Sequence, residues 1–162
     1  GEEHMWTPDA IARLQQYPDI GILHPSEDRR VKCCFDVHRE RPSGLKIVNM
    51  YDFVCPLFTA KALDAIGWRF NPLLTHGWGL DFETSYQVRS AGLKVARNDD
   101  VCVMHDTSTT YDLGRDGKYA NRGEFYQAAL VEMRSVLGKQ YGGDWEQRFY
   151  REHQEEVGTW RS

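Results

Sequence analysis

The stretch Gly77-Trp78-Gly79-Leu80-Asp81-Phe82-Glu83 predicts a tight turn that leads directly into a helix. Glycines on both sides of Trp78 permit unusual backbone conformations and let the chain pass close to whatever lies beside it. The helix is expected to run from Phe82 to Ala91, with Gly92 as its C-terminal stop. Asp81 therefore stands at the amino end of a helix, where N–H groups and the helix dipole stabilise a negative charge.

Four residues of this turn and its surroundings are candidates for a site. Asp81 is the strongest of them, although a simple N-cap aspartate explains its position as well. Glu83 points to another side of the helix and is expected to support or contact a substrate. Trp78 is either an exposed ring for a ligand to stack on or a core residue, and His76 is a candidate polar contact.

Strands and helices alternate along the chain, which predicts an α/β fold with a mixed sheet flanked by helices. Thr59 and Asn121 are predicted helix caps, and Glu124 forms a capping-box pattern with Asn121. The polar stretch 24–44 is interpreted as a connection, and Asn98-Asp99-Asp100 as a solvated turn between two strands. Helices are expected at 8–17, 59–66, 121–139 and 145–155, and strands at 20–23, 45–50, 53–58, 95–96 and 101–104.

The composition indicates one globular domain with its own core. The chain has 162 residues, 41% hydrophobic and 27% charged, with a net charge of -4. This charge argues against a nucleic-acid partner, which would favour a basic surface. No apolar run approaches the roughly 18 residues of a transmembrane helix and no secretory signal is visible, so a cytoplasmic location is expected, with peripheral membrane association left open.

The four cysteines show no metal-binding spacing, because no C-x-x-C pair occurs. Cys55 and Cys102 lie in apolar, strand-like runs and are expected to be buried, reduced thiols. Neither G-x-G-x-x-G nor a Walker A sequence is present, so the two common phosphate-binding loops are absent from the sequence.

His105 ends the predicted strand Val101 to Met104. The carboxyl edge of a sheet is where α/β folds place ligand sites, and imidazole is a common ligand for divalent metals. Asp106 could orient its ring. One histidine cannot form a site alone, and the sequence has no clear Asp-x-Asp pair to complete it.

Taken in order, these motifs resemble the second half of family 2 glycosyltransferases with the GT-A fold. The similarity covers about residues 6–150, and its specificity comes from the order Trp-Gly, Asp, Gly, His. It rests on 77–83, on Tyr86 and Arg89, on Ala91-Gly92-Leu93-Lys94-Val95, on Val101 to His105, and on the upstream segments 53–58 and 65–72. The tail, with 132–134, Leu137 and 139–145, is similar to the helical end of some bacterial and phage members. Residues 6–120 then correspond to the second half of a GT-A-like (Rossmann-like) core, and 121–162 to a helical C-terminal extension.

The resemblance implies an inverting transfer of sugar from a nucleotide-sugar donor, a UDP- or GDP-sugar, to a glycan or other hydroxyl acceptor. Asp81 matches the catalytic base, and we expect it to be ionised at neutral pH. Trp78 and Gly79 match the loop that shapes the acceptor and donor-sugar pocket. His105 matches a ligand of the divalent metal, Mn²⁺ or Mg²⁺, that neutralises the leaving diphosphate.

Two departures from the family pattern matter. Many members have glutamate where this chain has Leu80, which removes one contact to a sugar hydroxyl. The family's first half, with its nucleotide-binding segment and Asp-x-Asp motif, has no counterpart before Trp6, so we expect the sequence to be part of a longer protein. His4-Met5 is typical of a cloning scar, which leaves residues 1–5 open between tag remnant and native sequence.

Two other functions fit parts of the pattern. One is a noncatalytic carbohydrate-binding or assembly module with the same fold, which a true lack of donor-binding sequence would favour. The other is a metal hydrolase using His76, Asp81 and His105, but the chain lacks a ligand cluster such as H-E-x-x-H.

Overall fold

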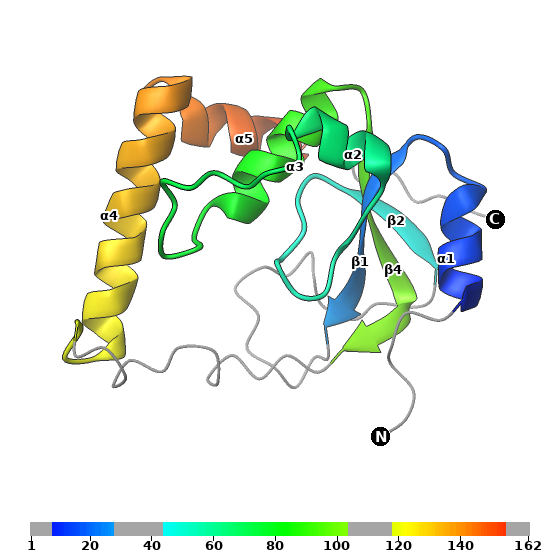
Figure 1. The fold of residues 1–162 in the computed structure, drawn as a ribbon, viewed down its shortest axis with the longest axis horizontal. Helices are drawn as coiled ribbons and strands as arrows, with labels where there is room; N and C mark the ends of the chain where they lie inside the picture. The colour runs from blue at the N-terminus through cyan, green and yellow to red at the C-terminus, as the bar shows by residue number, and fades with distance from the viewer. Residues whose placement is uncertain (1–7, 28–43, 104–117, 155–162) are drawn as a thin grey trace.

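The computed structural model of the chain describes residues 8–27, 44–103 and 118–154 (Figure 1). Within this part of the chain, a first helix is followed by three strands, two helices, a last strand and two further helices. The elements are α1 (Pro8–Gln15), β1 (Ile20–Glu27), β2 (Leu45–Val48), β3 (Leu57–Phe58), α2 (Ala60–Ala65), α3 (Leu80–Ser90), β4 (Lys94–Val103), α4 (Arg122–Tyr141) and α5 (Trp145–Gln154).

The strands form one mixed sheet in the order β2-β4-β1-β3. The central pair, β1 and β4, is parallel, with Leu23 opposite Ala96. Both outer strands run antiparallel to their neighbours, β2 beside β4 and β3 beside β1. The predicted α/β class with a mixed sheet flanked by helices is therefore confirmed.

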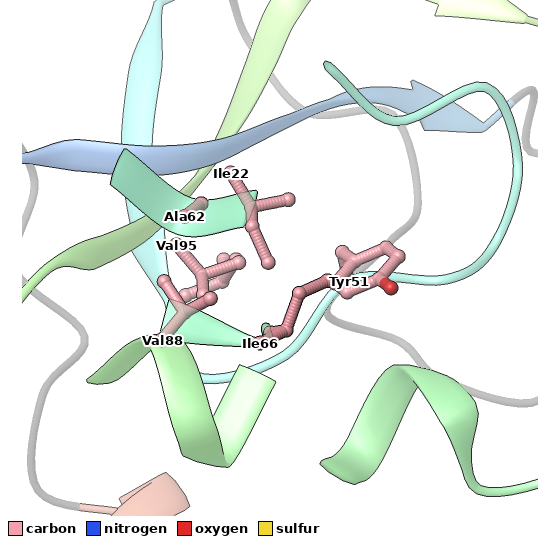
Figure 2. Close-up of a cluster of buried hydrophobic side chains, with 7 residues drawn as sticks. Ile22, Tyr51, Ala62, Ile66, Val88 and Val95 are labelled. Atoms are coloured by element: carbon pink, nitrogen blue, oxygen red, sulfur yellow. The ribbon is translucent and has the colours of Figure 1, made fainter. Parts of the chain in front are cut away.

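Each face of the sheet has its own apolar core. Helix α1 covers one face, where Leu14 and Tyr17 pack on a cluster that includes Ile20 and Leu23. Helices α2 and α3 cover the other face. The buried residues there are Ile22, Val48, Tyr51, Ala62, Ile66, Val88 and Val95 (Figure 2).

Gly21 lets α3 lie close to the sheet. It is the extra residue in a register shift between β1 and β4, since Ile20 pairs with Lys94 but Ile22 with Val95. A Cβ atom at Gly21 would come within 2.7 Å of Cγ1 of Val88 on α3. A larger side chain here would push α3, which carries Asp81, away from the sheet.

A third apolar cluster joins α4 and α5 to α3, on the side of α3 away from the sheet (Figure 1). Its buried members are Leu74, Met133, Leu137, Trp145 and Phe149. The C-terminal helices therefore pack against the segment that contains the candidate site.

Local capping signals were predicted correctly. The Thr59 side chain accepts a hydrogen bond from Ala62 N–H at the start of α2. Asn121 likewise caps α4 by accepting from Glu124 N–H at 3.0 Å. Gly92 follows α3 with φ +79°, and Gly142 ends α4 with φ +93°, conformations that favour glycine.

Two predictions for strands β1 and β4 are wrong. Strand β1 continues through Pro25 to Glu27, although the sequence suggested a connection from residue 24 onward. Pro25 is tolerated because the pairing with β4 is irregular immediately after it. Strand β4 is continuous, and Asp99 is buried in it rather than solvated in a turn. Salt bridges from Arg97 and Lys46 compensate the Asp99 charge.

The strand predicted at 53–58 is also mostly wrong, since only Leu57–Phe58 pairs with the sheet. Cys55 adopts φ +53°, a left-handed conformation that interrupts a strand, and it is exposed rather than buried. Cys102 has intermediate exposure in β4. Among the described residues, no helix is long and apolar enough to cross a membrane.

Candidate functional site

Asp81 occupies the first turn of α3 but does not cap it. Gly79 is the N-cap, with φ +87°, and Asp81 is the second helical residue. Its Oδ1 accepts a hydrogen bond from the Phe82 N–H at 2.9 Å. The carboxylate is thus held by the backbone at the helix start, as the sequence suggested, although the capping position belongs to glycine.

The surroundings of Asp81 raise its pKa from an ordinary 3.8 to about 7. Burial of the carboxyl group is the largest cause, and the negative charge of Asp52 is the second. Hydrogen bonds from the backbone at Gly79, Asp81 and Phe82 oppose the shift without cancelling it. The expectation that Asp81 is fully ionised at neutral pH is therefore wrong: burial and a neighbouring charge outweigh the helix terminus.

Tyr51 connects the segment that carries Asp52 to α3. Its hydroxyl lies 2.7 Å from Oγ1 of Thr84, and Thr84 donates its own proton to the Leu80 carbonyl at 2.6 Å. Tyr51 must therefore donate to Thr84. Figure 2 shows the ring at the margin of the aliphatic cluster, with its oxygen directed away from it.

Burial is the main reason that the pKa of Tyr51 is raised, and the charges of Asp81 and Asp52 add to the effect. Tyr51 therefore stays neutral at physiological pH, and its hydroxyl serves as a fixed hydrogen-bond donor. It fastens the segment after β2 to the first turns of α3.

Glu83 lies on another side of α3 from Asp81 and is almost fully buried, at 2% exposed. Its Oε1 accepts hydrogen bonds from the Tyr141 hydroxyl at 2.9 Å and from Nδ2 of Asn71 at 3.1 Å. The predicted site residues Asp81 and Glu83 are therefore in different surroundings. Glu83 links α3 to the end of α4 and to the loop after α2.

Trp78 and Gly79 contribute mainly to packing. Trp78 is half-buried beside the third apolar cluster, with its ring centroid 5.5 Å from that of Tyr126 on α4. A Cβ atom at Gly79 would come within 2.7 Å of Cγ of Met133. The close approach that the glycine permits is thus an approach to helix α4.

His76 belongs to a chain of polar groups between its loop and α4. Its Nδ1 lies 2.9 Å from Oε2 of Glu132, and the His76 backbone N–H donates to the other carboxylate oxygen at 2.9 Å. Thr75 also donates to Glu132, and the ring Nε2 of His76 contacts the hydroxyl of Tyr119. Burial raises the pKa of Glu132, but these hydrogen bonds outweigh it and hold that pKa below its usual value.

The predicted metal ligand His105, with Asp106, lies outside the described residues. Within residues 8–27, 44–103 and 118–154, no group of three or more histidine, cysteine, aspartate or glutamate residues could hold a metal ion. Asp52 and Asp81 are only two carboxylates, one fewer than such a group requires.

Comparisons with models of protein families, with curated proteins and with solved structures found no match for this chain.

The sequence interpretation missed Tyr51 and Asp52. Their signal was present, because they directly follow the predicted strand 45–50, and polar residues just past a strand are natural site candidates. No comparable local pattern marked Glu132 or Tyr141, which meet their partners 56 and 58 residues away in the chain.

Proposed function

We propose that this chain takes part in glycosyl transfer from a nucleotide sugar to a hydroxyl acceptor, with Asp81 as the general base. The observation that carries the proposal is the Asp81 carboxyl, whose pKa is raised to about 7 beside Asp52. A general base works best when its pKa lies near the operating pH. The sequence resemblance supports the same residue in the same role, and the mixed α/β sheet is compatible with a GT-A-like fold.

In this mechanism ionised Asp81 takes the proton from the acceptor hydroxyl. The acceptor oxygen forms a bond to the anomeric carbon while the bond from that carbon to the diphosphate oxygen breaks. The electron pair leaves with the nucleoside diphosphate, and inversion follows if the attack is direct. Asp52 acts through its charge, since it raises the proton affinity of Asp81.

The resemblance also implies a divalent cation, Mn²⁺ or Mg²⁺, with His105 as one ligand, which would stabilise the charge of the leaving diphosphate. The described residues do not form such a site, so no step here depends on one. The variant His105→Ala tests this role, and we expect its activity to depend less on Mn²⁺. An unchanged Mn²⁺ titration would show that His105 is not a metal ligand.

The central experiment is the variant Asp81→Asn within the native polypeptide, including any sequence before Gly1. Transfer is assayed from a panel of UDP- and GDP-sugars to hydroxyl acceptors. We expect the rate to fall about a thousandfold, because the general base is lost, while donor binding is retained. Near-normal turnover in this variant would contradict the assignment of Asp81.

The dependence of the transfer rate on pH, measured on the unaltered protein, is an independent test of the role of Asp81. The rate should rise with pH through about 7, as Asp81 becomes ionised. In Asp52→Asn the rise should move to lower pH, because one cause of the raised pKa is removed. The same profile in both proteins would exclude Asp52 from this role. Sugar binding without any transfer would favour the noncatalytic carbohydrate-binding or assembly module.

A further inference from the structure

A polar pocket lies beside α3, between the loop that follows α2 and the C-terminal end of α4. Its volume is about 350 Å³, within the range of roughly 300–1,000 Å³ that is typical of small-molecule sites. The polar and aromatic residues that line it are Arg69, Phe70, Asn71, Glu83, Gln87 and Gln140.

This pocket does not belong to the Asp81 site. Asp81 and Glu83 are two residues apart on α3, which places their side chains about 200° apart around the helix axis. Glu83 contacts the loop after α2 and the end of α4, whereas Asp81 interacts with the segment after β2. The pocket therefore offers a binding surface that the proposed transfer chemistry does not use.

The side chains of Glu83 and Gln87, which line the pocket, can accept further hydrogen bonds. Oε1 of Glu83 accepts from Tyr141 and Asn71, but Oε2 accepts no hydrogen bond from the part of the chain that the structure describes. Nε2 of Gln87 donates to the Tyr141 hydroxyl, and among the same residues nothing donates to its Oε1. These two oxygens can therefore accept hydrogen bonds from a ligand or from water in the pocket.

The other polar side chains of the pocket are held in place by hydrogen bonds to one another. Nδ2 of Asn71 donates to Oε1 of Gln140 at 3.0 Å, and Nε2 of Gln140 donates to the Tyr141 hydroxyl at 3.2 Å. Asn71 itself is fixed, because its Oδ1 accepts from the Leu73 N–H at 3.0 Å. Such mutual hydrogen bonds reduce the entropy lost when a ligand binds.

The charged side chains and the exposed ring of Phe70 indicate which class of ligand the pocket can bind. Glu83 and Arg69 have opposite charges, so the pocket favours a ligand without net charge. The ring of Phe70 is 39% exposed and is supported by Phe53 and Phe58, with centroids 5.1 and 5.9 Å away. It provides a firm apolar surface beside the hydrogen-bonding groups.

We propose that this pocket binds a neutral sugar unit of a saccharide, whose hydroxyls donate to Glu83 and Gln87 while one face of the sugar ring lies on Phe70. Several hydroxyl donors and an apolar C–H face are the features that this combination of amide, carboxylate and aromatic groups recognises. The inference goes beyond the proposed function, because it requires binding alone and no transfer.

The test is a titration of the isotope-labelled chain, followed by NMR, with methyl glycosides of glucose, galactose, mannose and N-acetylglucosamine. We expect at least one to cause saturable shifts at Glu83, Gln87 and Gln140. Gln140→Ala and Phe70→Ala change exposed residues and should each weaken binding about tenfold. Gln15→Ala, an exposed glutamine on α1 at the opposite face of the sheet, is the matched control and should bind normally.

Inorganic phosphate and Mg²⁺ serve as probes for the competing ligand classes. The proposal is overturned if no glycoside produces saturable shifts in the folded protein, if only phosphate or Mg²⁺ does, or if Gln140→Ala and Phe70→Ala bind as tightly as the Gln15→Ala control. Asp81→Asn should retain saccharide binding here, and loss of binding would contradict a pocket separate from Asp81. The titration measures binding alone, so a failure to detect glycosyl transfer would not count against this proposal.

Discussion

Asp81 and Glu83 are two carboxylates on the same helix, two residues apart, in opposite circumstances. Glu83 is buried but receives hydrogen bonds from Tyr141 and Asn71. Asp81 receives its hydrogen bonds from the backbone at the helix start and faces a second negative charge from Asp52. Helical geometry explains the contrast, since nearly opposite sides of one helix meet different parts of the chain. Glu83 therefore links α3 to neighbouring segments of the fold, whereas the pKa of Asp81 lies near neutral pH.

The largest effect on stability is expected at Glu83. Glu83→Ala leaves the Tyr141 hydroxyl and Nδ2 of Asn71 without their acceptor and opens space beside α3, so unfolding free energy should fall by about 3 kcal/mol. Glu83→Gln retains an acceptor oxygen and should recover most of the loss. Chemical denaturation measures both variants, and equal stability of Glu83→Ala and the unaltered protein would remove Glu83 as a structural link.

A smaller effect of opposite sign is expected at Asp81. Its folded-state pKa of about 7 exceeds the ordinary 3.8, so between these values the folded protein holds a proton that the unfolded chain releases. Its contribution is complete below about pH 4 and is lost as pH rises through 7. Asp81→Asn should therefore stabilise the protein at pH 8, on the order of 2 kcal/mol because the residue retains some solvent exposure, and by little at pH 4.

Thermal melts at the two pH values measure this difference. The exposed Asp144, changed to asparagine, is the matched control and should show no such gain at pH 8. If Asp81→Asn is no more stable than the unaltered protein at pH 8, then ionising Asp81 costs nothing, and the contrast with Glu83 is lost.

The smallest effect is expected at Glu132, a third carboxylate that is less buried than Glu83 and bonded by Thr75 and His76. Glu132→Gln should lower stability at neutral pH by about 1 kcal/mol. Its pKa is lowered in the folded state, so the stabilisation is present above the unfolded pKa and is lost as pH falls through the folded value. The difference between variant and unaltered protein should shrink in acid, and a difference independent of pH would contradict the ionic contribution.

The fold could be predicted where it depends on neighbours in sequence. The caps at Thr59 and Asn121 bond to N–H groups three residues away, so their residue types suffice to identify them. Continuity of β4 through Asp99 could not be predicted, because one of the two cations that neutralise this acid, Lys46, lies 53 residues away; the other, Arg97, is a near neighbour in sequence. Without the sheet that brings Lys46 close, an Asn-Asp-Asp run favours a turn.

The candidate site divides in the same way. The sequence by itself determined that Asp81 stands in the first turn of a helix, since a glycine turn, the helix composition and a glycine stop are local signals. Only the tertiary structure decided its protonation, because burial depends on how the chain packs around Asp81 and the charge of Asp52 comes from 29 positions earlier in the chain. It also decided that Glu83 faces Tyr141 and lines a pocket, which requires α4 to fold back against α3. Electrostatic surroundings depend on distance in space, and a sequence records only distance along the chain.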